Sequence, residues 1–187
     1  MSRDAVLLFL ASLALLGQGA LAVGLIALAG RSRTARLRQV IVESFGASAV
    51  AIALLIAVVA TAGSLYLSEV AHFVPCKLCW YQRIAMYPLP VLLASAMIWR
   101  RRDVHFYAIP VAALGSIISI YHILVERFPG LESSVCEVSN PCTVIWTRRF
   151  GYQTIPTMAL TGFSLIIVAL SIGAVSDRQV TRSQREQ

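Results

Sequence analysis

The chain has 187 residues, of which 58% are hydrophobic and only 13% are charged. Soluble domains carry about 25% charged residues, so this composition excludes an ordinary soluble globular domain. The hydrophobic residues fall in long uninterrupted runs, which indicates membrane spans. A net charge of +7 would also suit nucleic-acid binding, but the basic residues lie between the hydrophobic runs rather than on one face. We therefore attribute them to membrane topology and predict no nucleic-acid partner.

Five segments lack Asp, Glu, Lys and Arg and are candidate membrane spans. They are Ala5–Ala29, Phe45–Ser68, Ile84–Trp99, Val104–Leu124 and Ile155–Val175. A span needs about 20 residues and at least about 17, so the third segment is short, and it contains Pro88 and Pro90. We expect it to cross by recruiting residues 81–83 or by a local kink. The sequence thus predicts an all-α integral membrane protein that embeds in the lipid bilayer.

The arginines predict the orientation of these spans. With five spans, three clusters fall on one side: Arg31, Arg33, Arg36 and Arg38; Arg100, Arg101 and Arg102; and Arg178, Arg182 and Arg185. Short cytoplasmic loops are enriched in Lys and Arg, so this side is predicted to be cytoplasmic. The N-terminus is then extracytoplasmic and the C-terminus cytoplasmic.

The first span has a competing interpretation as a secretory signal peptide. Arg3, a hydrophobic run and the small residues of Ala27-Leu-Ala29 fit that pattern. However, the run exceeds the about 7–15 residues usual in signal peptides. Cleavage would also leave the Arg31–Arg38 cluster outside. We therefore expect a retained helix.

The four cysteines form two close pairs, both predicted to be extracytoplasmic. Cys76-Lys-Leu-Cys79 directly precedes the third span, and Cys136-Glu-Val-Ser-Asn-Pro-Cys142 lies in the loop Val125–Thr154. They could form a redox relay, two structural disulfides or one four-thiolate metal site. The wide second spacing and an oxidising compartment argue against structural zinc. Because the small ring of a Cys-x-x-Cys disulfide restrains little chain entropy, we favour the relay.

Two further residues are candidates for the electron exit. Cys79 and Arg83 are four apart and share a helix face, and a nearby cation favours the reactive thiolate. The chain has no haem or nucleotide-binding motif, whereas a quinone could arrive through the bilayer and receive a hydrogen bond from Arg83. The alternative for Arg83 is an interfacial arginine that snorkels. His122, one turn before Glu126, could relay protons or be an interface histidine.

The segment after the second cysteine pair mixes aromatic and basic residues. Thr143-Val-Ile-Trp-Thr-Arg-Arg-Phe-Gly-Tyr152 suits a short stretch that lies in the membrane interface. It is equally typical of an aromatic flank of the last span. The sequence leaves both interpretations open.

Several of these motifs resemble those of one known family. Cys76-Lys-Leu-Cys79-Trp-Tyr-Gln-Arg83, followed by Met86-Tyr87-Pro88, resembles the signature of the DsbB/BdbC disulfide-bond formation proteins. Asn140-Pro-Cys142 and Phe150-Gly-Tyr-Gln-Thr-Ile-Pro156 resemble the BdbC-type branch. The resemblance implies a bacterial plasma-membrane oxidoreductase. It would reoxidise an extracytoplasmic DsbA/BdbD-like thioredoxin-fold partner and reduce a membrane quinone, either ubiquinone or menaquinone.

The resemblance covers roughly residues 45–175 and implies a four-helix transmembrane bundle. The expected fold class is therefore this bundle plus one additional N-terminal transmembrane helix, Ala5–Ala29, for which the family supplies no role. The chain then divides into 1–44, with a basic cytoplasmic loop; 45–175, the redox domain with outer loops 69–83 and 125–154; and 176–187, the cytoplasmic tail.

The resemblance also implies a role for each cysteine. The partner's thiolate would attack the Cys136–Cys142 disulfide at Cys136, and Cys142 would then exchange with Cys76. Cys79 would be the thiolate facing the quinone, assisted by Arg83. Well-known members separate their loop cysteines more widely than this chain does. Two alternatives remain, namely a vitamin-K-epoxide-reductase-like protein and a non-catalytic membrane protein with structural disulfides or a metal site.

Overall fold

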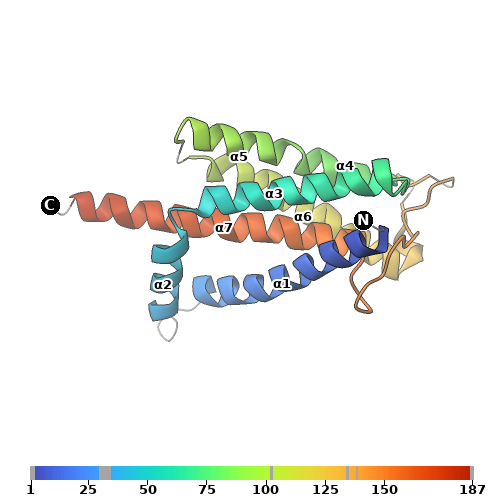
Figure 1. Ribbon diagram of the computed structural model, residues 1–187, viewed down its shortest axis with the longest axis horizontal. Coiled ribbons are helices and arrows are strands. Elements are labelled where there is room, and N and C mark those ends of the chain that lie inside the picture. Colours follow the sequence, from blue (N-terminus) through green and yellow to red (C-terminus); the bar gives the residue numbers. More distant parts are fainter. Residues whose placement is uncertain (1–2, 30–34, 102, 134, 138, 186–187) are drawn as a thin grey trace.

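The computed structural model describes residues 3–29, 35–101, 103–133, 135–137 and 139–185. Long helices run roughly side by side along one axis, and loops gather at the end where α1 begins (Figure 1). In the part of the chain that is described, β-structure is limited to two isolated bridges. The elements are α1 (Arg3–Ala29), α2 (Ala35–Phe45), α3 (Ala49–Leu65), the π-helix η1 (Tyr66–Val70), α4 (Lys77–Met86), α5 (Pro88–Ile98), α6 (His105–Arg127), the 3-10 helix η2 (Pro129–Leu131) and α7 (Ile155–Arg185).

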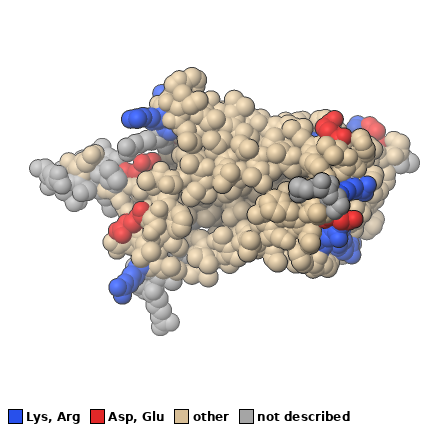
Figure 2. Space-filling view, viewed as in Figure 1, with Lys and Arg blue, Asp and Glu red and all other residues tan. Residues whose placement is uncertain are grey.

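Four helical stretches among the described residues are long and apolar enough to cross a membrane. They are Arg3–Ile26, Ala49–Val70, His105–Arg127 and Ile155–Gln179. They correspond to four of the five expected spans, so the all-α membrane fold is confirmed. Charged side chains gather at the two ends of the molecule and leave a broad uncharged middle, as a bilayer requires (Figure 2).

The third expected span consists of two shorter helices, α4 and α5, which meet at Tyr87. Pro88 lacks a backbone N–H and therefore suits the first turn of a new helix. Tyr87 keeps helical backbone angles and donates its N–H to the Arg83 carbonyl at 2.8 Å. The two helices run on from one another beside α3 and α6. Residues 81–83 belong to α4, and the chain passes from α4 to α5 at Tyr87; that this pair of helices crosses the membrane stays a prediction.

The bundle is built around α7, which packs against α6, α3 and α1. Small residues allow these close approaches, as is usual in membranes. A Cβ atom at Gly115 of α6 would lie only 2.3 Å from Phe163 of α7. The main core joins residues of α3, α4, α5, α6 and α7: Ala53, Ala57, Ala85, Met86, Leu89, Leu93, Ala108, Ala112, Phe163, Ile166 and Leu170.

One element was not expected, because α2 occupies part of the region predicted as a basic loop. It lies across the end of the bundle opposite the outer loops (Figure 1). Val42 is buried, whereas Val40 and Phe45 are exposed. A short helix with basic and apolar residues suits the membrane interface. The sequence interpretation used the arginines of this segment only as topology signals and therefore missed the helix.

Candidate redox site

Cys76 and Cys79 sit at the start of α4. Cys76 is the N-cap residue, and its Sγ accepts a hydrogen bond from the Cys79 backbone N–H at 3.4 Å. The two Sγ atoms are 3.2 Å apart, and both cysteines are free thiols in this structure. Cys76 is buried and Cys79 is partly exposed. Thiolates are stabilised at helix N-termini, so this pair lies where the local structure favours reactivity.

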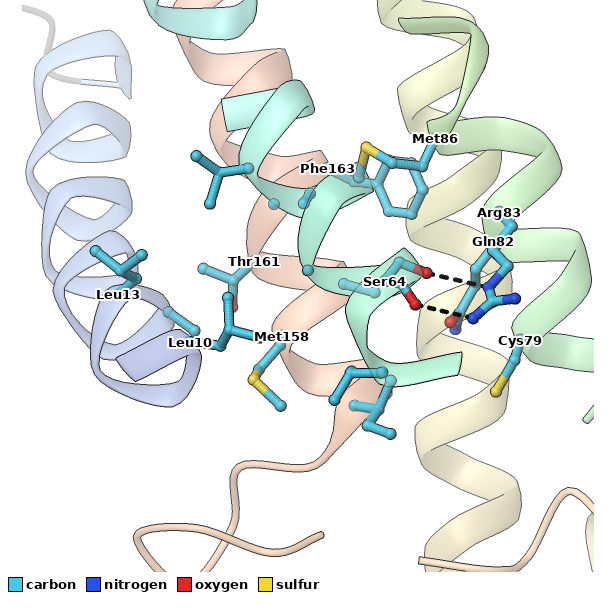
Figure 3. A pocket seen from close by; sticks show the side chains of 18 of the residues that line it. Leu10, Leu13, Ser64, Cys79, Gln82, Arg83, Met86, Met158, Thr161 and Phe163 are labelled. Atoms are coloured by element: carbon cyan, nitrogen blue, oxygen red, sulfur yellow. Dashed lines mark hydrogen bonds between the residues drawn. The ribbon is translucent and has the colours of Figure 1, made fainter. Parts of the chain in front are cut away.

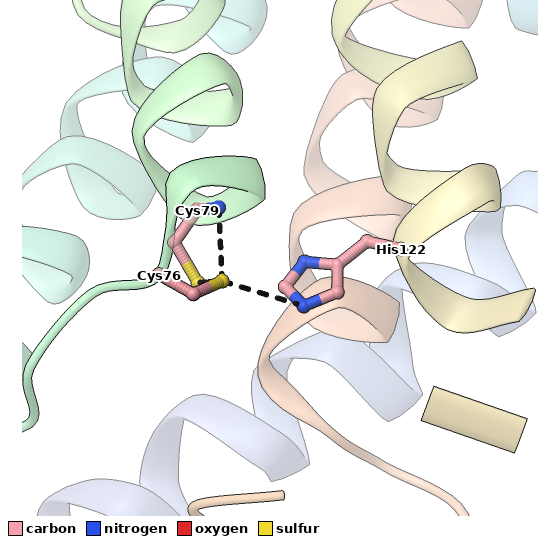
Figure 4. Close-up of side chains that lie close together, drawn as sticks. All are labelled: Cys76, Cys79 and His122. Carbon is pink, nitrogen blue, oxygen red and sulfur yellow. Dashed lines mark hydrogen bonds between the residues drawn. The ribbon is translucent and has the colours of Figure 1, made fainter. Parts of the chain in front are cut away.

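His122 of α6 links this pair to the outer loop. Its Nε2 atom lies 3.7 Å from Cys76 Sγ (Figure 4). The same atom lies 3.2 Å from the Cys142 carbonyl oxygen. Its Nδ1 atom lies 3.4 Å from Gln82 Nε2, which can only donate. The ring thus lies within hydrogen-bonding distance of Gln82 on its Nδ1 side and of the Cys142 carbonyl on its Nε2 side. His122 is buried between helices, so it is not an exposed interface histidine.

These contacts favour a thiolate at Cys76. A hydrogen bond from the Cys79 thiol, together with the smaller effect of His122, lowers the pKa of Cys76 to about 4, although burial opposes the shift. The sequence interpretation placed the thiolate on Cys79 because Arg83 lies one turn later. In the structure, the groups that stabilise a thiolate converge on Cys76 instead.

Cys136 and Cys142 form a disulfide in the outer loop. The Cys142 N–H donates to Glu132 Oε1 at 2.7 Å, and the Asn140 side chain donates to the Pro75 carbonyl at 3.1 Å. Cys142 belongs to the buried cluster that also contains Cys76, and Cys136 packs against that cluster while staying only partly buried. Both cysteines of the loop pair therefore lie by the α4 pair, and Cys136 is the more exposed of the two.

Metal coordination by all four cysteines does not fit this arrangement. The disulfide removes two of the four thiolates. Sulfur and nitrogen atoms of Cys76, Cys79 and His122 do lie within 4.8 Å of one another. Structural zinc sites are almost always four-coordinate, so these three residues alone do not complete one.

Arg83 lies between α4 and α3 and not at an exposed interface. It is 9% exposed, and it donates from Nε to Ser64 Oγ and from Nη2 to the Ser64 carbonyl, both at 3.0 Å (Figure 3). Its guanidinium also lies 5.1 Å from the centre of the Trp80 ring. The snorkelling alternative is therefore wrong. Spacing predicted that Arg83 and Cys79 lie on the same face of a helix. In the structure, both side chains line the same cavity.

This cavity has a volume of about 340 Å³ and lies among α1, α3, α4 and α7. Cys79, Gln82, Arg83 and Ser64 form its polar part, and the remaining lining is mostly apolar (Figure 3). A site with a few convergent polar groups and apolar walls is typical of small-molecule binding. Sequence reasoning missed Gln82 and Ser64. The only available signal was Gln82's place in the quoted motif and Ser64's polarity within an apolar run.

Comparison with known proteins adds a decisive observation. Residues 46–173 match the family described as "Disulfide bond formation protein DsbB". The chain belongs to the DsbB family. It is therefore a disulfide-forming membrane oxidoreductase, and the recognition drawn from the cysteine motifs is confirmed. No solved structure matches the chain.

Three curated relatives resemble this DsbB-family chain over most of their own length. Probable disulfide formation protein C 2 of Bacillus anthracis is 42% identical over 126 residues, covering 67% of this chain and 90% of the relative. Disulfide bond formation protein C of Bacillus subtilis (strain 168) is 42% identical over 118 residues, covering 63% and 86%. Probable disulfide formation protein C 2 of Bacillus cereus (strain ATCC 10987) is 41% identical over 130 residues, covering 70% of this chain and 92% of the relative. The family match begins after α1 and α2.

Proposed function

We propose that this protein is a thiol:quinone oxidoreductase. It would take two electrons from the dithiol of an extracytoplasmic DsbA/BdbD-like thioredoxin-fold protein and pass them through both cysteine pairs to a membrane quinone. The observation that carries this proposal is the position of His122, whose Nε2 atom contacts both Cys76 Sγ and the Cys142 carbonyl. Two cysteine pairs that both contact the buried His122 suit an electron relay better than two independent structural disulfides.

The first step takes place at the loop disulfide. The partner's thiolate attacks Cys136, the more accessible sulfur, which breaks the Cys136–Cys142 bond and leaves Cys142 as a thiolate. The partner's second thiolate then attacks the mixed disulfide. The partner leaves oxidised, and the loop pair holds two electrons as two thiols.

The second step moves the electrons to the α4 pair. The Cys142 thiolate attacks Cys76 in the Cys76–Cys79 disulfide, and Cys79 leaves as a thiolate. Cys136 then displaces Cys76, which restores the loop disulfide and leaves the α4 pair reduced. Exchange is faster when the leaving thiol has a low pKa, and the lowered pKa of Cys76 favours this last displacement. The structure has the redox state that follows it, with the loop pair oxidised and the α4 pair as thiols.

The cavity residues fit a quinone. A bound quinone supplies a two-electron, two-proton acceptor. Arg83 and Gln82 provide N–H donors at the polar part of the cavity, and Cys79 lines the same space. Ser64 holds the guanidinium through two hydrogen bonds, so Arg83 is positioned in advance to stabilise negative charge on a carbonyl oxygen.

We also propose an orientation in a bacterial plasma membrane. The starts of α1 and α4 lie at one end of the bundle, whereas α2 and the end of α7 lie at the other (Figure 1). Cys76 and Cys79 sit at the start of α4, and the loop pair lies in the same cluster. The arginine distribution assigns the second end to the cytoplasm. Residues 45–175 would then form the redox domain, flanked by the N-terminal segment 1–44 and the tail 176–187.

Trapping tests the relay directly. In a Cys142→Ser variant the loop disulfide is absent and Cys136 is a lone thiol. The partner is an extracytoplasmic thioredoxin-fold protein whose second active-site cysteine is replaced by serine and whose first cysteine carries a mixed disulfide with 2-nitro-5-thiobenzoate. We expect the Cys136 thiolate to displace nitrothiobenzoate, which leaves as a thiolate, and to form an adduct that Cys142 can no longer resolve. The matched Cys136→Ser variant should form far less of it. Absence of an adduct in both variants would contradict the proposed order of attack.

A further inference from the structure

Helix α1 contributes to the cavity although it precedes the family match, which begins at residue 46. Leu10, Leu13 and Ala14 of α1 form one wall, and Leu55 and Val59 of α3 lie among the lining residues across from them. Figure 3 shows Leu10 and Leu13 on α1, set apart from the polar group of Ser64, Arg83 and Cys79. The extra helix therefore encloses the site that the rest of the bundle presents.

The packing of α1 explains how this space is kept open. Gly17 and Gly24 bring α1 close to α7, since a Cβ at either position would lie 2.7 Å from a side chain of that helix. Near its outer end, α1 reaches α3 at Gly63, where a Cβ would lie 3.2 Å from Leu10. Farther along the two helices, apolar side chains line the cavity instead. Leu55 is 64% exposed, so this part of the wall borders the lipid.

The position of α1 is held by contacts with the outer loops. Asp4 forms an ion pair with Arg149, and the Tyr152 hydroxyl donates to Gln18 at 2.5 Å. Gln18 in turn donates to Thr161 of α7 at 3.2 Å. These contacts join α1 to the rest of the molecule at two positions along its length, Asp4 and Gln18. They make α1 a fixed wall rather than a loosely attached anchor.

The length of the cavity points to a ligand with a tail. Ser64, which holds Arg83, and Leu55 are nine positions apart on α3, which corresponds to about 13 Å at the helical rise of about 1.5 Å per residue. That distance exceeds one aromatic ring. The polar part would hold a quinone ring, and the apolar remainder leads away from it towards the lipid-exposed Leu55.

We propose that the slot between α1 and α3 binds the isoprenoid tail of the quinone and that α1 thereby sets the preference for long-tailed acceptors. This inference rests on the proposed thiol:quinone activity. A tail that enters from lipid gains little from leaving water, because lipid tails are as apolar as the slot. Shape and close packing therefore decide the preference, and filling the slot with an equally apolar but larger side chain should remove it.

The test compares two tryptophan substitutions on α1. Leu13→Trp places bulk in the slot, whereas Leu16→Trp is the matched control, because Leu16 is 72% exposed and does not line the cavity. Each protein is assayed with a long-tailed isoprenoid quinone and with a tail-less quinone of the same ring. We expect the ratio of kcat/KM, long-tailed over tail-less, to fall about tenfold in Leu13→Trp, the order expected from overpacking a fitted site. It should stay at the wild-type value in Leu16→Trp.

A second measurement needs no substitution. A quinone with a photoreactive diazirine at the end of its tail should label residues 3–29 of the wild-type protein, and excess unlabelled long-tailed quinone should prevent the labelling. Labelling confined to α7, or labelling of α1 only by a photoreactive phospholipid, would overturn the proposal. So would an equal ratio in both tryptophan variants. A wild-type protein that reduces neither quinone would instead contradict the proposed function itself.

Discussion

The Nε2 atom of His122 lies 3.7 Å from the Sγ atom of Cys76. The histidine comes from α6 and the cysteine from the start of α4, so the contact connects parts of the chain that are 46 residues apart. It adds to the Cys79 hydrogen bond in lowering the pKa of Cys76, and it links the inner cysteine pair to the loop pair through the Cys142 carbonyl.

The lowered pKa of Cys76 predicts an unusual titration of the reduced protein. A group whose pKa is about 4 is ionised at every pH above that value. The thiolate absorbance of Cys76 should therefore persist as the pH falls from 8 and disappear only near pH 4. Ordinary thiols lose it near pH 8.5, their usual pKa. The measurement is the absorbance difference at 240 nm between the reduced wild type and Cys76→Ser, and a midpoint near pH 8.5 would contradict the assignment.

Replacing His122 should slow exchange between the two pairs. A His122→Leu variant removes the contacts with Cys76, Gln82 and the Cys142 carbonyl together. Hydrogen bonds to charged groups contribute about 1.5–3 kcal/mol, so we expect at least about a tenfold slower transfer from the loop pair to the α4 pair. Rapid quenching with an alkylating reagent measures it. The absorbance midpoint of Cys76 should also rise, and an unchanged midpoint with a slow rate would indicate a purely structural histidine.

Arg83 should matter for quinone reduction more than for thiol exchange. Arg83→Met removes the guanidinium that lines the cavity, and loss of one donor that stabilises developing negative charge typically costs about 100-fold or more. Ser64→Ala is a milder change for comparison. It removes the hydroxyl that accepts from Arg83 Nε and leaves the backbone carbonyl that accepts from Arg83 Nη2. We expect a smaller loss for Ser64→Ala. Equal losses in quinone reduction and in partner exchange would identify Arg83 as a structural residue.

The close packing of α6 on α7 predicts a large difference between two glycines. At Gly115, an added Cβ would lie 2.3 Å from buried Phe163, whereas at Gly19 it would meet no atom within 4 Å. Gly115→Ala should lower the free energy of unfolding by about 1–3 kcal/mol, the usual cost of overpacking. Gly19→Ala should not lower it. Thermal unfolding in detergent compares the two, and similar melting temperatures would contradict the helix packing described.

The orientation is tested by reporter fusions after Arg38, Asp103 and Gln187. The arginine clusters predict that all three positions are cytoplasmic. Enzymatic reporters that are active on only one side of the membrane distinguish the outcomes. An extracytoplasmic signal after Arg38 would mean that α1 does not cross the membrane as proposed.

Most of the spans could be predicted from the sequence because each is a local, continuous property of the chain. The Cys76–Cys79 motif and the loop pair were also visible as spacings. The partners of Arg83 and His122 could not be predicted, because Ser64 and Gln82 meet them only after helices pack. Spacing places Arg83 on the same helix face as Cys79, but it does not say where a long side chain ends. The contribution of α1 to the cavity was hidden for the same reason.

The central claim is that electrons pass through both cysteine pairs to a quinone, and stoichiometric turnover without oxygen tests it most directly. Purified protein is mixed with a reduced thioredoxin-fold partner and a long-tailed quinone, and partner disulfide and quinol are both counted. The wild type should form one quinol for each partner disulfide over many cycles. Cys79→Ser, which keeps the loop disulfide but breaks the inner pair, should form no quinol. Quinol formation by Cys79→Ser at the wild-type rate, or partner oxidation by the wild type without quinol, would contradict the relay.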